Sequence, residues 1–252
     1  YKFIFLIFNF TLLFSEGLWV KYGWELYHYV VDAQTASLGN AVTAYNTNSI
    51  HSSLINPSFV SSNKNFSITH QSRFSGMVNN DLFGIQLKSS SAPINLNFLY
   101  QGISNIPDTR DMLLDWGLDG QFGTNDIGGG NGVIDEGERL NEEKLKFFNQ
   151  HQLGFHGAFK SNIFGLKLGL GLKLLGHFLD DHHAIGMGLD IGYSKKISKS
   201  TIGLVARDLP ASGLIWDSGT FEGTKPSLSL GLHHPLQYFE KIHLQINTMM
   251  KQ

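Results

Sequence analysis

The sequence predicts an all-β protein, an antiparallel β-barrel that crosses a membrane with its strands. The clearest evidence is residues 163–178, where leucine occupies positions 166, 168, 170, 172 and 174, and glycine or lysine fills the positions between. Successive side chains of a strand point to opposite faces, so this segment has one apolar face and one small, polar face. Its length of about ten residues suits a tilted strand crossing a bilayer. We therefore expect these leucines to face lipid, and Lys167 and Lys173 to face the barrel interior.

The same alternation recurs along the chain and predicts nine strands. They are residues 65–74, 81–88, 93–101, 149–159, 163–178, 184–195, 200–208, 227–234 and 241–249. Twelve of the 28 glycines lie within these segments, where they would interrupt a helix. An odd strand number is unusual in a bacterial barrel, which favours a C-terminally truncated sequence. The alternative is that the ninth strand closes the sheet.

The connections between these strands support a membrane orientation. If the barrel begins on the periplasmic side, the two longest connections, residues 102–148 and 209–225, both fall on the outer side. Short periplasmic turns and long outer loops are typical of outer-membrane barrels. A mean hydropathy of -0.08 agrees with this, because a barrel distributes its apolar residues by alternation.

Composition and motifs exclude several classes of function. The net charge of -2 provides no basic surface for nucleic acid. The absence of cysteine excludes disulfides and thiolate metal sites. The chain has no Gly-x-Ser-x-Gly elbow, His-Glu-x-x-His pair or phosphate-binding loop, so we expect no enzymatic activity.

The N-terminal residues 1–17 are expected to be a secretory signal peptide. Lys2 precedes an apolar run over residues 3–14, which is followed by Ser15, Glu16 and Gly17. A basic start, a short apolar core and small residues after it are typical of such signals. We expect residues 18–62 to form a separate N-terminal segment and residues 63–252 to form the barrel, with a long outer loop at 102–148.

Residues 36–57 carry a more specific pattern. Ala-Ser-Leu-Gly-Asn-Ala-Val-Thr-Ala at 36–44 is followed by a polar spacer and then by Asn56 and Pro57. This order resembles the N-terminal segment of PorV/PorQ-type proteins, which are outer-membrane barrels related to the FadL fatty-acid transporters and are associated with type IX secretion. Ser58 and Phe59 stand where that family usually has Ala-Gly. Glycine-apolar segments at 152–159, 169–173 and 186–192 also fit the family, as does Val-Ala-Arg-Asp-Leu at 205–209.

The resemblance implies a fold and two functions. In FadL-like barrels the segment before the first strand folds into the lumen as a hatch, which would place Asn56 and Pro57 at a tight turn. The alternative is an ordinary strand and loop on the periplasmic face. PorV/PorQ-type proteins sit in the bacterial outer membrane and act with secretion-system proteins or secreted cargo in type IX secretion or cargo attachment. The alternative is a FadL-like transporter of a hydrophobic ligand. A soluble secreted β-sandwich is the third hypothesis, and would require the leucine faces to pack on another sheet.

The outer loop contains acidic residues spaced like the ligands of calcium loops. Asp115, Asp119 and Asp126 match positions 1, 5 and 12 of a twelve-residue calcium loop, although Gly117 stands at position 3. A second, partial loop is formed by the following ligand candidates: Asn131, Asp135 and Glu138. Hard oxygen ligands favour Ca²⁺ over Zn²⁺, so we expect a structural Ca²⁺ that orders this long loop. The alternative is a solvated acidic loop.

Overall fold

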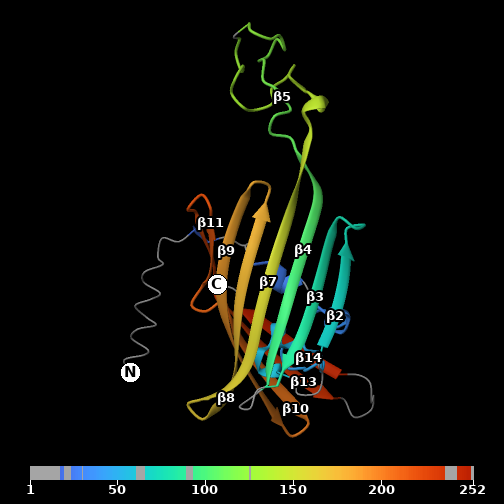
Figure 1. Ribbon diagram of the computed structural model, residues 1–252, viewed down its shortest axis with the longest axis vertical. Coiled ribbons are helices and arrows are strands. Elements are labelled where there is room, and N and C mark those ends of the chain that lie inside the picture. Colours follow the sequence, from blue (N-terminus) through green and yellow to red (C-terminus); the bar gives the residue numbers. More distant parts are fainter. Residues whose placement is uncertain are drawn as a thin grey trace, which may run out of the picture. The chain divides into compact units, whose positions relative to one another are not determined.

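The computed structural model describes residues 18–19, 24–29, 31–60, 66–88, 93–124, 126–235 and 243–250. The expected signal peptide at 1–17 lies outside these residues. The chain divides into two compact units, one made of residues 1–102 and 151–252, and the other of residues 103–150 (Figure 1). Strands dominate the first unit, which confirms the all-β expectation.

The first unit is built on a twelve-stranded sheet that is antiparallel except where β1 meets β12. Along its main path the strands follow the order β1-β12-β11-β9-β8-β7-β4-β3-β2, while β10 pairs with β9 and β13, and β13 pairs with β14. The strands are β1 (Leu18–Trp19), β2 (Phe66–Arg73), β3 (Val78–Leu87), β4 (Ile94–Asp108), β7 (Lys146–Ile163), β8 (Leu166–Leu179), β9 (His182–Ile197), β10 (Ser200–Arg207), β11 (Ser212–Trp216), β12 (Phe221–Thr224), β13 (Ser227–Pro235) and β14 (His243–Met250). Within the described strands the sheet is not closed, because β2 pairs with β3 alone.

Each of the nine expected strands has a counterpart in this sheet, namely β2, β3, β4, β7, β8, β9, β10, β13 and β14. Their bounds differ from those expected, most of all in β4, which continues to Asp108, and in β3 and β7, which already begin at Val78 and Lys146. The expectation of an outer loop at 209–225 was wrong, since β11 and β12 lie there. Gly213 and Gly219 obscure the alternation in this stretch, and β11 and β12 are only five and four residues long.

The ladder beside β9 is interrupted. β10 pairs with β9 as far as the Ala206–Ile191 pair, and β11 resumes the pairing at Gly213 and Met187. Between these positions the backbone of Asp208 adopts a positive φ of 58°, which interrupts the regular ladder, and the N–H of Leu209 still donates to the carbonyl of Leu189 at 2.8 Å. β10 and β11 therefore pair with the same edge of β9, β10 with residues 191–197 and β11 with residues 184–187.

The N-terminal segment contributes four short helical turns. They are α2 (Leu26–Tyr29), α3 (Ala33–Ser37), α4 (Ser52–Ile55) and the 3-10 turn η1 (Pro57–Phe59). Asp32 caps α3 by accepting a hydrogen bond from the backbone N–H of Thr35 at 2.8 Å. Trp24, Leu26 and Leu54 of the segment pack into one core with leucines of the sheet, namely Leu82, Leu99, Leu175 and Leu214. The segment therefore covers one face of the sheet. No helix in the described part of the chain is long and apolar enough to cross a membrane.

The second unit contains the ends of β4 and β7 and a small two-stranded sheet of β5 (Leu113–Leu114) and β6 (Arg139–Leu140), followed by the 3-10 turn η2 (Glu142–Lys144). The backbone N–H of Asn141 donates to the carbonyl of Met112 at 2.7 Å and closes the base of this unit. Many of its remaining side chains are exposed.

Candidate functional site

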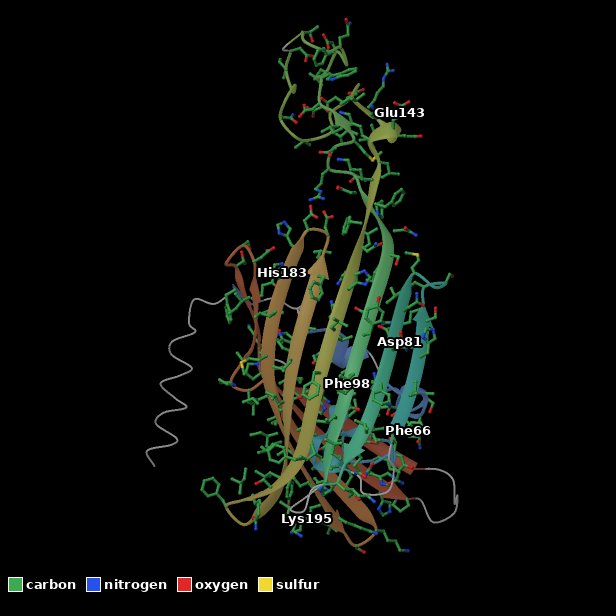
Figure 2. The ribbon with its side chains drawn as sticks, in the orientation of Figure 1. Phe66, Asp81, Phe98, Glu143, His183 and Lys195 are labelled. Carbon is green, nitrogen blue, oxygen red and sulfur yellow. The ribbon has the colours of Figure 1, made fainter. Side chains whose placement is uncertain are left out.

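The two faces of the main sheet have opposite chemistry. The face covered by the N-terminal segment buries polar side chains, namely Asn80, Gln86, Asn95, Asn97, Gln101, Gln152 and His156. The opposite face exposes large apolar side chains, including Phe66, Ile68, Phe83, Phe98, Leu153, Leu174, Ile185, Met187 and Leu189. Phe66 and Phe98 project from this apolar face (Figure 2). A sheet in water normally buries its apolar face and exposes its polar one.

Strand β8 shows this division most sharply. Leu172 and Leu174 are 37% and 42% exposed, whereas Lys173 between them is 2% exposed. The alternation expected for this segment is therefore present. Lys167 has the same parity as Lys173 but is exposed, because it lies one residue after the start of the strand, beyond the residues that the N-terminal segment covers.

The predicted turn at Asn56 and Pro57 lies in a trough of glycines on the buried face. A Cβ at Gly169 of β8 would overlap the peptide between Pro57 and Ser58, and one at Gly192 of β9 would overlap the Asn56 side chain. The turn supports itself as well, because Oδ1 of Asn56 accepts from the backbone N–H of Ser58 at 3.0 Å. Its Nδ2 donates to the carbonyl of Thr43 at 2.8 Å. Only glycine in the strands permits this close approach.

A buried charge cluster lies beside the interrupted ladder. Nζ of Lys173 is 2.8 Å from Oδ1 of Asp190 and 2.5 Å from Oδ1 of Asp208. The backbone N–H of Asp208 donates to Asp190 at 2.9 Å, and the hydroxyl of Ser212 donates to Asp208 at 2.7 Å. These contacts join β8, β9 and the start of β11 at the point where the ladder is broken.

Aromatic rings of the N-terminal segment cover this cluster. Nζ of Lys173 lies 5.7 Å from the ring centroids of both Trp24 and Tyr27. The hydroxyl of Tyr27 donates to the carbonyl of Phe155 at 2.9 Å and to that of Leu174. The ammonium group is therefore held between two carboxylates and two ring faces, an arrangement that stabilises a cation removed from water.

Arg207 connects the cluster to α4. Its Nη2 donates to the carbonyl of Ile55 at 2.6 Å and its Nη1 to that of Leu54 at 3.4 Å. These carbonyls end α4, where a helix leaves acceptors without partners of its own. With Lys173, Asp190 and Asp208, Arg207 completes a set of two buried cations and two buried carboxylates.

A second polar chain links the segment to the sheet. Nδ1 of His51 is 2.9 Å from Oδ1 of Asn97, whose Nδ2 donates to Ser53 at 3.2 Å and lies 3.3 Å from Nδ1 of His156. β4 and β7 are joined to α4 through these side chains. Sequence reasoning did not identify either network, although a charged or amide residue within a strand of apolar alternation is a usable signal for one.

The predicted calcium residues lie in the second unit and are linked to its backbone. Asp115 accepts from the backbone N–H groups of Gly130 and Gly132, each at 2.6 Å, and the Gly132 contact lowers the pKa of its carboxyl. Glu138 accepts from the N–H groups of Gly117 at 2.8 Å and Asp135 at 2.9 Å. The loop therefore folds around its own carboxylates.

The other four predicted ligands belong to the same set of contacts. Oδ2 of Asp126 accepts from the N–H of Asp119 at 2.8 Å, and Nδ2 of Asn131 donates to Asp135 at 2.7 Å. Across the described residues, no group of three or more His, Asp or Glu side chains is arranged to hold a metal ion. Calcium binding stays a prediction.

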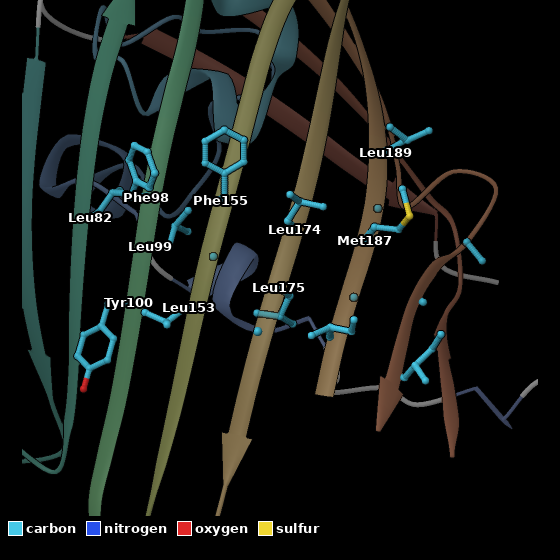
Figure 3. A pocket seen from close by; sticks show the side chains of 18 of the residues that line it. Leu82, Phe98, Leu99, Tyr100, Leu153, Phe155, Leu174, Leu175, Met187 and Leu189 are labelled. Carbon is cyan, nitrogen blue, oxygen red and sulfur yellow. The ribbon is translucent and has the colours of Figure 1, made fainter. Parts of the chain in front are cut away.

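The exposed apolar face contains a large depression of about 1230 Å³ (Figure 3). It extends from Ile68 of β2 to Phe221 of β12 and includes residues on both sides of the interrupted ladder, among them Met187 and Pro210. Phe98, Phe155 and Leu174 stand along it (Figure 3).

Comparisons of this chain with protein-family models, curated proteins and solved structures found no match.

Proposed function

We propose that this chain is an outer-membrane β-barrel protein of the PorV/PorQ type that takes part in type IX protein secretion or in attaching cargo at the cell surface. The observation that carries the membrane location is the inverted sheet, with polar residues buried and large apolar residues exposed. Outer-membrane strands have this apolar-out, polar-in alternation. In water the exposed face would be an apolar patch of the kind that causes aggregation.

The proposed location in the outer membrane also requires the sheet to close into a barrel. The hydrocarbon core offers no partner for the backbone groups of an open sheet edge, so a spanning sheet closes on itself. β2 is such an edge among the described strands. We propose that it is paired in the membrane.

The N-terminal segment serves as the hatch of this barrel. It packs on the polar face through Asn56 and Pro57, which lie against glycines of β8 and β9, and its carbonyls at Leu54 and Ile55 accept hydrogen bonds from Arg207 of β10. A hatch packed this closely against the sheet closes the barrel interior. Recognition of secretion-system proteins or cargo is therefore assigned to the outer loops.

The loop unit at 103–150 is the proposed recognition element for secretion-system proteins or cargo. Removing residues 109–141 should impair secretion or attachment while the barrel still inserts, because the deletion includes no residue of β4 or β7, which pair with each other. Release of surface proteins is the readout, and heat-modifiable migration of the barrel is the insertion control. Normal secretion by an inserted deletion variant would rule out this role of the loop.

A FadL-like transporter is the second candidate, favoured by one observation. The apolar depression reaches the interrupted ladder at Gly188 and Leu209. A hydrophobic molecule in the depression would therefore lie beside the place where the strand pairing of β9 is interrupted. Uptake of a labelled fatty acid tests it. Loss of uptake with normal secretion, on substituting Met187→Trp to block this position, would favour transport over secretion.

A further inference from the structure

The depression on the apolar face arises from a change in side-chain size. Gly176 of β8 pairs with Ile185, and Gly213 of β11 pairs with Met187. Alternation places both glycines on the exposed face, like Leu174 and Ile215. Neighbouring outward positions carry large side chains, so Gly176 leaves the surface low at that point, whereas the Phe221 ring lies against Gly213.

We propose that this depression retains a membrane phospholipid, with the acyl chains lying along the apolar floor and the headgroup at the end marked by Asp81 and Tyr100. The inference rests on the proposed membrane location and goes beyond it, because it assigns a bound lipid to one place on the barrel wall.

The size and lining suit long hydrocarbon chains. The volume of about 1230 Å³ exceeds the roughly 300–1,000 Å³ of pockets for compact ligands. One side is a continuous aromatic wall, since the Phe83 and Phe98 ring centroids are 6.2 Å apart and those of Phe98 and Phe155 are 5.3 Å apart. Met187 is 58% exposed, and its flexible side chain can adapt its conformation to a bound acyl chain.

Polar groups mark one end of the depression. Asp81 lies one outward position beyond Phe83 on β3, and Tyr100 lies one outward position beyond Phe98 on β4. Because these strands run antiparallel, both positions are at the same end. Asp81 is 2.8 Å from Nδ1 of His70, and the Tyr100 hydroxyl is 2.9 Å from Nδ1 of His151.

This combination has the chemistry of a zwitterionic headgroup site. A carboxylate complements an ammonium group, while a phenol and two imidazoles supply hydrogen bonds to phosphate oxygens. The depression therefore has one polar end and a long apolar body, as a phospholipid does.

Two matched variants test the site. Gly176→Leu adds a side chain within the depression, where the nearest atom to its Cβ belongs to the Phe178 ring at 3.4 Å. Gly157→Leu adds the same side chain to an outward position of β7 outside the depression, where the nearest atom belongs to Leu96 at 3.5 Å. Both substitutions enlarge the same face, so a general effect on insertion would appear in both.

The measurement is native mass spectrometry of the full chain, delipidated in detergent and then given dipalmitoyl phosphatidylethanolamine. We expect one lipid retained by the unmodified chain and by Gly157→Leu, and affinity about tenfold weaker in Gly176→Leu, which equals about 1.4 kcal/mol. We also expect Asp81→Asn to abolish the preference for this lipid over dipalmitoylglycerol, which lacks the charged headgroup.

Equal retention by the two glycine variants would overturn the proposal. A preference for palmitate over the phospholipid would also overturn it, and would support the transporter candidate. Fractionation of cells separates this failure from failure of the proposed function. If all variants are found in the outer membrane but bind lipid equally, only the lipid site is wrong; if the unmodified chain is absent from that membrane, the proposed function is wrong.

Discussion

At the scale of single residues, the buried charges are the most consequential feature. Lys173, Asp190 and Asp208 are almost inaccessible to solvent and are held by short contacts, and with the buried Arg207 their charges balance. Charges that are buried in this way tolerate joint replacement far better than the loss of one partner.

Lys173→Met should therefore destabilise the first unit by about 3–5 kcal/mol, because it removes the ammonium group that contacts both buried carboxylates and leaves two buried anions with Arg207 alone. Urea unfolding of the protein in detergent, followed by tryptophan fluorescence, measures the free energy of unfolding. The matched control is Lys167→Met, an exposed lysine on the same strand face, which should change stability by no more than about 0.5 kcal/mol. Adding Asp208→Asn leaves Asp190 with Arg207 as its buried cation and restores the charge balance of the cluster, so the double variant should recover much of the loss. A Lys173→Met variant as stable as its control would contradict the role given to the cluster.

A second prediction at this scale concerns the glycine trough. Gly192→Ala places a Cβ where the Asn56 side chain lies, and should cost about 1–3 kcal/mol or displace the turn. Hydrogen exchange of residues 43–59 should then become faster. Gly157→Ala is the control, since its Cβ would meet ordinary contact distances. Unchanged exchange in Gly192→Ala would show that the turn is not held by this close approach.

At the scale of elements, the loop unit at 103–150 depends on carboxylates that hold its backbone. The Gly132 N–H group lowers the pKa of Asp115 in the folded loop. A lowered folded-state pKa means that this carboxylate stabilises the loop above its ordinary pKa, and that the contribution is lost as pH falls through the lowered value. Amide exchange at Gly130 and Gly132 should therefore be protected at neutral pH and become faster on acidification, relative to the turn at Gly165. Protection that does not change with pH would exclude this role for Asp115.

Calcium should add to this order if the predicted ligands bind it. Titration calorimetry of the whole chain should then show binding at or below about 10⁻³ M Ca²⁺, the weakest range of extracellular sites. Asp119→Ala should abolish the heat of binding, whereas Glu136→Ala, an exposed acidic residue outside the predicted ligand set, should not. No heat at millimolar calcium would identify the loop as a self-supporting acidic loop.

At the scale of the whole molecule, the decisive property is which face of the sheet meets lipid. Because the chain contains no cysteine, single cysteines report cleanly on position. A fluorophore on Leu172→Cys or Leu174→Cys should be quenched strongly by a lipid-soluble nitroxide, because both side chains lie on the exposed apolar face. A fluorophore on Ser53→Cys, in the covered segment, should be quenched weakly. The reverse order of quenching would exclude the proposed membrane topology.

The sequence by itself determined the longer strands of the main sheet and their faces. Alternation is a local property of the backbone, so Leu172, Lys173 and Leu174 could be assigned to faces without knowledge of any partner strand. The turn at Asn56 and Pro57 was also accessible, because Asn and Pro favour a turn through their own local hydrogen bonds and fixed φ.

Only the tertiary structure decided what these faces meet. The contacts of Lys173 with Asp190 and Asp208, and of Arg207 with α4, join residues 17 to 153 positions apart, and no local pattern encodes such distances. The replacement of a predicted loop by β11 and β12 has the same origin, because these strands are too short to show alternation and are defined by their pairing with β9, with β1 and with each other. Local periodicity thus assigns side chains to faces, whereas long-range pairing decides where the wall is interrupted and which charges become neighbours.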